Sequence, residues 1–219
     1  MNNLSNDLEL IIGNKNYSSW SLRPWLAMRV IGLNFVESVI PLDHDDTKSR
    51  ILARSPAGRV PVLRDGDVVV WESLAICEYI AEANPVLWPE DATARASARA
   101  VAAEMHAGFM ELRKAMPMNC RRTPAKISTT PEIDADIARV FDIWRDSRAR
   151  FGDGGDFLFG AFSIADAMFA PIVSRLHVYD VDMDAVCDVY RDAVLRHPPM
   201  CDWLDAAGSE AWVIDRLEV

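Results

Sequence analysis

The spacing of apolar residues changes at residues 84–91, and this change limits the possible folds more than any other feature of the sequence. Before it, short apolar runs alternate with helical patterns, whereas after it every apolar stripe has helical spacing. The junction, NPVLWPED, carries two prolines, which interrupt regular structure. Because 219 residues suffice for two small cores, we expect an α/β domain over residues 1–85 and an all-α domain over residues 86–219.

The first part begins with a strand, a polar loop and a helix. Residues 8–12, LELII, form an apolar run that ends at a glycine, as is typical of a buried strand. After the loop NKNYSSWS, apolar residues at helical spacing predict a helix whose N-cap is Ser19 or Ser21. Residues 35–42 predict a second strand. The charged residues 43–54 have no clean period, which favours a surface loop, with a binding flap as the alternative.

A β-hairpin and a second helix complete this part. Residues 60–63 and 68–71 are short apolar runs separated by the turn-forming sequence DGD. Ser73 is suited to cap a helix that runs to residue 83. The order of strand, helix, strand, loop, hairpin and helix is an α/β arrangement of the size of a small domain.

The second part is helical. Apolar stripes over residues 98–116 and 133–144 repeat at helical spacing, and Pro131 is suited to start the second one. Ser163 and Asp166 form the S-x-x-D pattern of a capping box in front of a further apolar helix. Each amphipathic stripe needs another element to cover it, so we expect these helices to pack together.

Charge and cysteine content argue against several classes of protein. The formal net charge is −10, and the densest basic cluster is only Arg121, Arg122 and Lys126, so we expect no nucleic-acid partner. No apolar run is long enough to cross a bilayer, and the amino terminus lacks the pattern of a secretory signal. The four cysteines include no C-x-x-C pair, so we expect no metal site, and unpaired thiols suit a reducing, cytoplasmic location.

Three segments, in this order, resemble the cytosolic glutathione transferases: YSSWSLRPWLA at residues 17–27, GRVPVL at 58–63 and WESLAICEYI at 71–80. FSIADAMFAP, at residues 162–171, is similar to the capping-box helix of the same family. The resemblance implies a thioredoxin-like amino-terminal domain that holds glutathione as co-substrate. It also implies an all-helical domain that shapes the pocket for a small electrophile, and a homodimer.

The resemblance matches both ends of glutathione to polar residues. Ser73 lies at a helix start, where N–H groups favour an anion, and is matched to the γ-glutamyl carboxylate. Glu72 is matched to the ammonium group. The alternative for Ser73 is a plain N-cap without a ligand. Arg59 is matched to the glycine carboxylate, with Lys48 and Arg54 as competitors for that role.

The middle of glutathione is matched to the segment before the hairpin. In the family the bond preceding the matching proline is cis, which implies a cis Pro61 here. A cis bond turns the Val60 backbone outward to pair with the cysteinyl main chain, in the manner of an added strand.

The thiol of glutathione must lose its proton to attack an electrophile. A hydroxyl donor and the positive end of a helix would both stabilise the thiolate, and Ser18, Ser19 and Ser21 lie at the start of the first helix. The resemblance to the serine-type classes assigns the catalytic role to Ser18. Ser19 and Ser21 are then supporting glutathione-site residues or caps, and Tyr17 is the rival donor, because other classes use a tyrosine.

The second substrate is expected to meet the first long helix of the second part, where we place a pocket formed by Tyr17, His106, Phe109 and Arg113. The leading hypothesis is a glutathione transferase that conjugates glutathione to a hydrophobic electrophile through a serine-stabilised thiolate. The SS-x-S-x-R pattern is similar to the zeta class, although Trp20 stands where zeta enzymes carry a cysteine. The alternatives are therefore a maleylacetoacetate isomerase-like activity and a non-catalytic glutathione-binding module.

Overall fold

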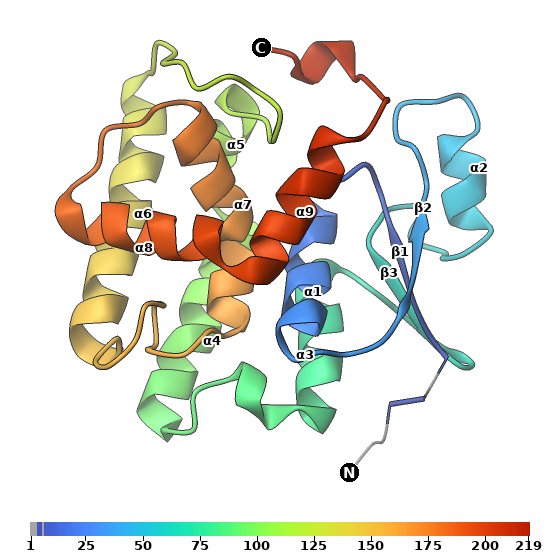
Figure 1. Cartoon of the computed structure of the whole chain (residues 1–219), viewed down its shortest axis with the longest axis horizontal. Coiled ribbons are helices and arrows are strands. Elements are labelled where there is room, and N and C mark those ends of the chain that lie inside the picture. The colour runs from blue at the N-terminus through green and yellow to red at the C-terminus, as the bar shows by residue number, and fades with distance from the viewer. Residues whose placement is uncertain (1–3, 6) are drawn as a thin grey trace.

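The computed structural model describes residues 4–5 and 7–219 (Figure 1). Its described strands form a four-stranded sheet in the order β2-β1-β3-β4. The strands are β1 Leu8–Ile12, β2 Val36–Val39, β3 Val62–Asp65 and β4 Val68–Trp71. β1 and β2 are parallel, whereas β3 is antiparallel to both β1 and β4. The helices that follow complete the predicted fold class, a small α/β unit and an all-α unit.

The two faces of the sheet are covered by different helices. Alternate residues of a strand face opposite sides, and Leu10 belongs to the main core while its neighbour Ile11 belongs to a small second cluster. α1 Ser19–Val30 and α3 Ser73–Ala83 contribute to the main core. The second cluster includes Ile51 of α2 Thr47–Leu52, so α2 covers the opposite face, as Figure 1 shows.

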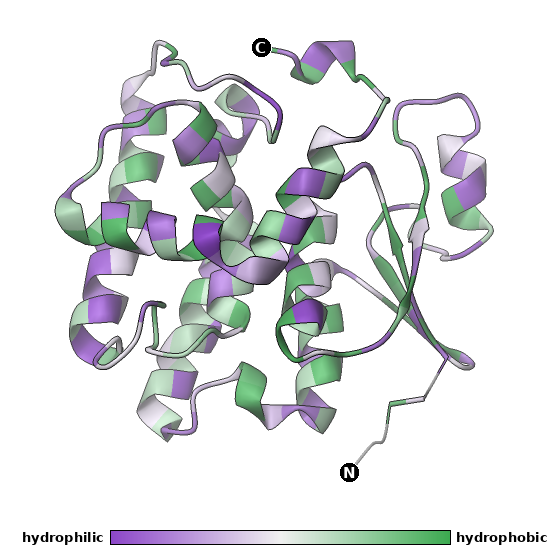
Figure 2. Cartoon of the chain, in the orientation of Figure 1, coloured by the Kyte–Doolittle hydropathy of each residue, from purple (hydrophilic) through white to green (hydrophobic). Residues whose placement is uncertain are grey.

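The remaining helices form a bundle that packs on α1 and α3 (Figure 1). They are α4 Ala92–Ala107, α5 Met110–Ala115, α6 Pro131–Phe151, α7 Ile164–Val178, α8 Ala185–Arg196 and α9 Pro198–Gly208, with 3-10 turns at Pro85–Leu87 and Asp215–Leu217. α7 is buried on nearly every side and contacts α1, α4 and α8. The outer helices α6 and α8 alternate hydrophilic and hydrophobic residues, as amphipathic helices do (Figure 2). No described helix combines the length and the apolar character that a membrane span needs.

Two local predictions are confirmed in detail. Asp65 pairs with Val68 across a two-residue turn in which Gly66 has φ 57°, a conformation that favours glycine. Ser163 and Asp166 form the capping box of α7, and the Ser163 N–H donates to the Asp166 carboxylate at 2.8 Å. Both predictions depend on chemistry between residues close in sequence.

The predicted N-caps of α1 and α3 are wrong by a residue or more. The N-cap of α1 is Ser18 rather than Ser19 or Ser21, because the Ser18 carbonyl already accepts helical hydrogen bonds. The N-cap of α3 is Glu72 rather than Ser73, because the Glu72 carbonyl accepts the first helical bond and Ser73 is already helical. Ser18, expected just before the helix, is therefore the N-cap of α1, and Ser73, expected to be the cap, is the first residue of α3.

Three segment boundaries also differ from the predictions. The charged segment expected to be a loop contains α2, because burial of Ile51 against the sheet stabilises a six-residue helix that lacks a sequence pattern. β2 ends at Val39 rather than at residue 42. The stripe over residues 98–116 is interrupted between α4 and α5, where Phe109 has φ 61°.

Candidate functional site

A cavity of about 340 Å³ lies between the start of α3, the segment before β3, and helices α1 and α4. It brings together six residues that the sequence predicted to be functional: Arg59, Val60, Pro61, Glu72, Ser73 and His106. Trp20, Ala57 and Trp71 complete its lining. We therefore take this cavity as the candidate site.

Ser73 supplies a buried hydroxyl without a partner. Its side chain is 1% exposed, and its Oγ makes no hydrogen bond to any described residue. Leaving such a group unpaired costs about 1–3 kcal/mol. The first N–H groups of α3, which have no helical acceptor, lie at the same end of the helix and carry the positive end of its dipole. This position can bind an anion that accepts hydrogen bonds.

Glu72 places a carboxylate beside that anion position. Its backbone has φ 70°, a conformation that costs a residue with a side chain about 1–3 kcal/mol and that is common at ligand sites. The side chain is 50% exposed, and its Oε2 lies 3.8 Å from Nε2 of His106. An anion-binding helix start next to a carboxylate is suited to a group that carries both an ammonium and a carboxylate.

The Val60–Pro61 peptide bond is cis, as the resemblance implied. Pairing between β3 and β1 begins at Val62. Val60 therefore lies just outside the ladder, and it lines the cavity. Main-chain groups in such a position can pair with an extended peptide.

Arg59 is the candidate cation that lines the cavity. The two competitors have partners elsewhere. Nζ of Lys48 donates to the Gly58 carbonyl at 3.3 Å, and Arg54 forms an ion pair with Glu9. Arg59 is exposed, so it can reach a second anionic group of a ligand.

The three serines of the loop are buried and do not line the cavity. Oγ of Ser18 lies 2.7 Å from Oγ of Ser21, and the Ser21 oxygen also accepts the N–H of Gly13 at 3.1 Å. Ser19 is the first residue of α1 and is 8% exposed. Ser18 therefore occupies the N-cap position with a hydroxyl whose orientation is set by Ser21.

Tyr17 points toward the carboxy-terminal segment. Its hydroxyl donates to the Glu218 carboxylate and accepts from Arg121 at 3.0 Å and from the N–H of Ile214 at 3.3 Å. One donor and two acceptor positions are thus in use, which is the full capacity of a phenol. Tyr17 does not line the cavity, although the sequence placed it in the substrate pocket.

The three residues of the helical part that were expected in the substrate pocket differ in their distance from the cavity. His106 lines the cavity, and burial is the main cause that lowers its pKa, with a further contribution from Arg23. Arg113 lies against the Trp20 ring, with its Cζ 4.8 Å from the ring centroid. Phe109 is 6% exposed and belongs to the main core, so it does not reach the cavity.

Trp20 is one of three lining residues, with Ala57 and Trp71, that sequence reasoning did not assign to the site. Its ring also lies 4.2 Å from Cζ of Arg23 and makes an edge contact with His106, with 5.3 Å between ring centroids. Trp71 was missed in the same way. Both are next to predicted site residues in the sequence, and that adjacency was the available signal.

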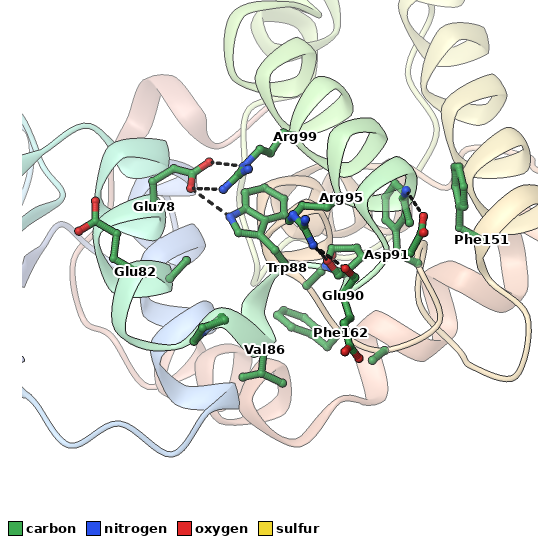
Figure 3. A pocket seen from close by; sticks show the side chains of 17 residues that line it. Glu78, Glu82, Val86, Trp88, Glu90, Asp91, Arg95, Arg99, Phe151 and Phe162 are labelled. Atoms are coloured by element: carbon green, nitrogen blue, oxygen red, sulfur yellow. Dashed lines mark hydrogen bonds and ion pairs between the residues drawn. The ribbon is translucent and has the colours of Figure 1, made fainter. Parts of the chain in front are cut away.

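A larger cavity of about 920 Å³ lies between α3, the linker and α4 (Figure 3). Several of its labelled charged side chains already have partners in the chain. Glu78 accepts from Nε1 of Trp88 at 3.0 Å and pairs with Arg99, while Arg95 donates to main-chain carbonyls of Pro89 and Glu90. We therefore prefer the smaller cavity as the ligand site, because it contains the unpaired Ser73 hydroxyl.

The thiols of the chain itself lie elsewhere. All four cysteines are unpaired, as predicted, and none lines the smaller cavity. Burial raises the pKa of Cys77 to about 12 and that of Cys120 to about 11. Among the described residues no group of His, Cys, Asp and Glu is arranged to hold a metal ion.

Two family models match the chain. The glutathione S-transferase amino-terminal domain matches residues 17–83, and the glutathione S-transferase carboxy-terminal domain matches residues 130–206. The chain belongs to the glutathione S-transferase family. The first match contains the three serines of the loop, the cis proline and the Glu72–Ser73 pair.

Curated relatives of the chain include glutathione S-transferases and a probable maleylacetoacetate isomerase. The chain is 24% identical over 187 residues to glutathione S-transferase L1 of Arabidopsis thaliana, a match that covers 84% of this chain and 71% of that protein. It is 33% identical over 96 residues to a probable maleylacetoacetate isomerase of Caenorhabditis elegans, covering 43% and 44% of the two chains. Two other matches, to rice GSTF2 and maize IN2-1, span only 23% and 63% of those relatives.

Solved structures share the fold. A glutathione transferase homolog from Burkholderia gl BGR1, solved with bound glutathione, has a TM-score of 0.70 at 21% identity and covers 92% of this chain and 98% of that one. A maleyl pyruvate isomerase described as a bacterial zeta-class transferase has a TM-score of 0.70 at 22% identity, covering 93% and 100%. These likenesses show the glutathione S-transferase fold.

Proposed function

We propose that this transferase binds glutathione in the cavity of about 340 Å³ and conjugates it to a hydrophobic electrophile. The observation that carries the proposal is the buried Ser73 hydroxyl, which has no partner at the start of α3. The γ-glutamyl carboxylate would supply the missing acceptor. The Burkholderia homolog, which has the same fold and was solved with glutathione, supports this ligand.

The other groups of glutathione are assigned to further residues that line the cavity. Glu72 accepts from the γ-glutamyl ammonium, which places opposite charges together in a charge-assisted bond. The main chain of Val60 pairs with the cysteinyl main chain. Arg59, the exposed cation of the lining, binds the glycine carboxylate.

Ser18 is proposed to stabilise the thiolate. Because the Ser21 oxygen already accepts the Gly13 N–H, Ser21 can give its own proton to the Ser18 oxygen. The Ser18 proton is then available to the sulfur. A hydrogen bond to a charged group is worth about 1.5–3 kcal/mol, which corresponds to a fall of about one to two units in the pKa of the thiol.

The reaction balances without a further reagent. The thiol proton leaves to solvent, and the thiolate forms a carbon–sulfur bond with the electrophile. In a substitution, the bond to the leaving group breaks and that group departs with the electron pair.

Calorimetric titration with glutathione, followed by turnover of reactive aryl halides, tests the proposal. We expect Ser73→Ala to weaken glutathione binding by about tenfold and Ser18→Ala to lower kcat with little change in glutathione affinity. Ser19→Ala and Tyr17→Phe are matched controls in the same loop, and both should keep the wild-type kcat. Absence of glutathione binding by the wild-type protein would refute the proposal, and equal losses in Ser18→Ala and Ser19→Ala would refute the role of Ser18.

Glutathione-dependent isomerisation is the second candidate, favoured by the match to a probable maleylacetoacetate isomerase and by the fold shared with maleyl pyruvate isomerase. Direct assay with maleylacetoacetate separates it from conjugation. A glutathione-binding module without turnover is the third candidate, since the yeast protein Ure2p, solved in complex with glutathione, has a TM-score of 0.69 to this chain. Glutathione affinity without activity on a panel of electrophiles would favour the module.

We also propose that the protein is a cytoplasmic homodimer. Each subunit would consist of two domains, with the boundary after residue 85. The unpaired thiols suit a reducing compartment. Trp71 and Val68 on the edge strand β4 are 43% and 46% exposed, and such apolar residues suit a subunit contact. Light scattering of the purified protein tests the oligomeric state.

A further inference from the structure

Two guanidinium groups lie against Trp20, and a third is close enough to act on one of them, in a chain whose net charge is −10. Arg23 and Arg113 both lie close to the indole, with their Cζ atoms 4.2 Å and 4.8 Å from the ring centroid. Arg175 is 6% exposed, and its charge contributes to lowering the pKa of Arg23. None of the three lines the cavity, but Arg23 and Arg113 contact Trp20, which lines it together with His106.

None of these three groups forms an ion pair with a described carboxylate. Arg175 donates to the Met116 and Pro171 carbonyls. Arg113 donates to the carbonyls at the end of α4, and its Nε has no acceptor. Arg23 is 1% exposed, and neither its Nε nor its Nη1 has an acceptor among the described residues.

The nearby carboxylates are committed elsewhere. Oδ2 of Asp136 accepts the N–H groups of Glu111 and Leu112, each at 3.1 Å. Asp136 attracts the Arg113 charge but makes no hydrogen bond to it. The Glu72 carboxylate is near His106, with Oε2 3.8 Å from its Nε2, and forms no ion pair with the three arginines. In the proposed function, Glu72 is neutralised by the glutathione ammonium.

Buried cations without counterions are costly, and an anion supplied from outside offsets that cost. The two carboxylates of glutathione are already matched to Ser73 and Arg59, so the remaining positive charge acts on the other substrate. Resting on the proposed glutathione site, we propose that the electrophile carries a carboxylate that binds next to Trp20, in contact with Arg113. Arg113 is half-buried and the most accessible of the three, while Arg23 acts through the indole as a positioning residue.

A matched pair of ligands tests this inference. Chloronitrobenzoic acid and its methyl ester have the same ring, and only the acid carries the anion. Each is titrated by calorimetry into protein saturated with S-methylglutathione, which has no free thiol and keeps the glutathione site filled. We expect the acid to bind about tenfold more tightly than the ester, as a hydrogen bond to a charged group predicts.

Variants locate the effect. Arg113→Met should abolish the preference for the acid, and Arg113→Lys should restore part of it. Lys114→Met is the matched control, because Lys114 is the adjacent cation, is exposed and pairs with Glu111, so the wild-type preference should remain. Thermal unfolding of each variant shows that it is folded.

Equal or tighter binding of the ester, no binding of either ligand, or an unchanged preference in Arg113→Met overturns the inference. The glutathione site is judged separately by the titration with S-methylglutathione alone. If that ligand fails to bind while the free protein still prefers the acid through Arg113, the proposed function fails and the carboxylate site stands.

Discussion

Replacement of Asp166 by alanine should destabilise this protein more than replacement of any exposed helix cap. The Asp166 carboxylate accepts the N–H of Leu158 at 3.0 Å, the N–H of Ser163 at 2.8 Å and the Ser163 hydroxyl at 2.9 Å, and the side chain is fully buried. Alanine leaves two buried N–H groups without acceptors, at about 1–3 kcal/mol each. Burial raises the pKa of Asp166 to about 6, so the ionised group is itself costly, and we expect a net loss of about 2–4 kcal/mol.

Asp91→Ala is the control for this prediction. Asp91 caps α4 with the same chemistry, since its carboxylate accepts the N–H groups of Thr93 and Ala94 at 3.0 and 2.8 Å, but it is exposed. Water can replace it there, so the expected loss is about 1 kcal/mol. Urea unfolding near neutral pH gives both free energies. Equal losses for the two variants would refute the claim that burial, rather than the capping geometry, sets the cost.

Two further predictions concern titratable groups. The folded-state pKa of Asp166, about 6, lies above the ordinary value of 3.8. Protonation of this group therefore contributes its full stabilisation of the fold at pH values below 3.8, and that contribution is lost as the pH rises through 6. The difference in unfolding free energy between wild type and Asp166→Ala should therefore grow from pH 7 to pH 5, and a difference that shrinks would contradict the assignment. Burial raises the pKa of Cys77 and Cys187 to about 12 and that of Cys120 to about 11. An aryl disulfide reagent should therefore label at most one thiol rapidly in the native protein and all four in urea. Rapid labelling of Cys77 in the native protein would show that the fold opens there.

Local chemistry made much of the fold predictable. The turn at Gly66 and the capping box at Ser163 each depend on residues within a few positions of one another, so the sequence carries the full signal. α2 carries no such signal, because its stability comes from Ile51, which packs on the far face of the sheet. The cap of α3 was misplaced for a related reason, since the strained backbone of Glu72 is held by the tertiary structure and not by its own preference.

In the candidate site, too, the features set by local motifs were predictable and those set by distant contacts were not. Motifs of a few residues predicted the segments that meet at the cavity, including Pro61 and Ser73. They did not predict where Tyr17 and Phe109 point, because those directions depend on distant parts of the chain. Glu218, which is 201 positions after Tyr17, takes the tyrosine hydroxyl.

The position of Ser18 also depends on the helical part, although every residue of its loop is near the amino terminus. The Glu210 carboxylate accepts the N–H groups of Lys15 and Asn16 at 2.7 and 3.0 Å, and Nε1 of Trp203 donates to the Lys15 carbonyl at 3.0 Å. These bonds fix the loop from α9 and from the segment that follows it. The amino-terminal unit supplies the hydroxyl, and the carboxy-terminal segment holds the backbone that aims it. An isolated amino-terminal unit would lose these three bonds, so it would keep the serines without the loop geometry on which the proposed role of Ser18 as a donor depends.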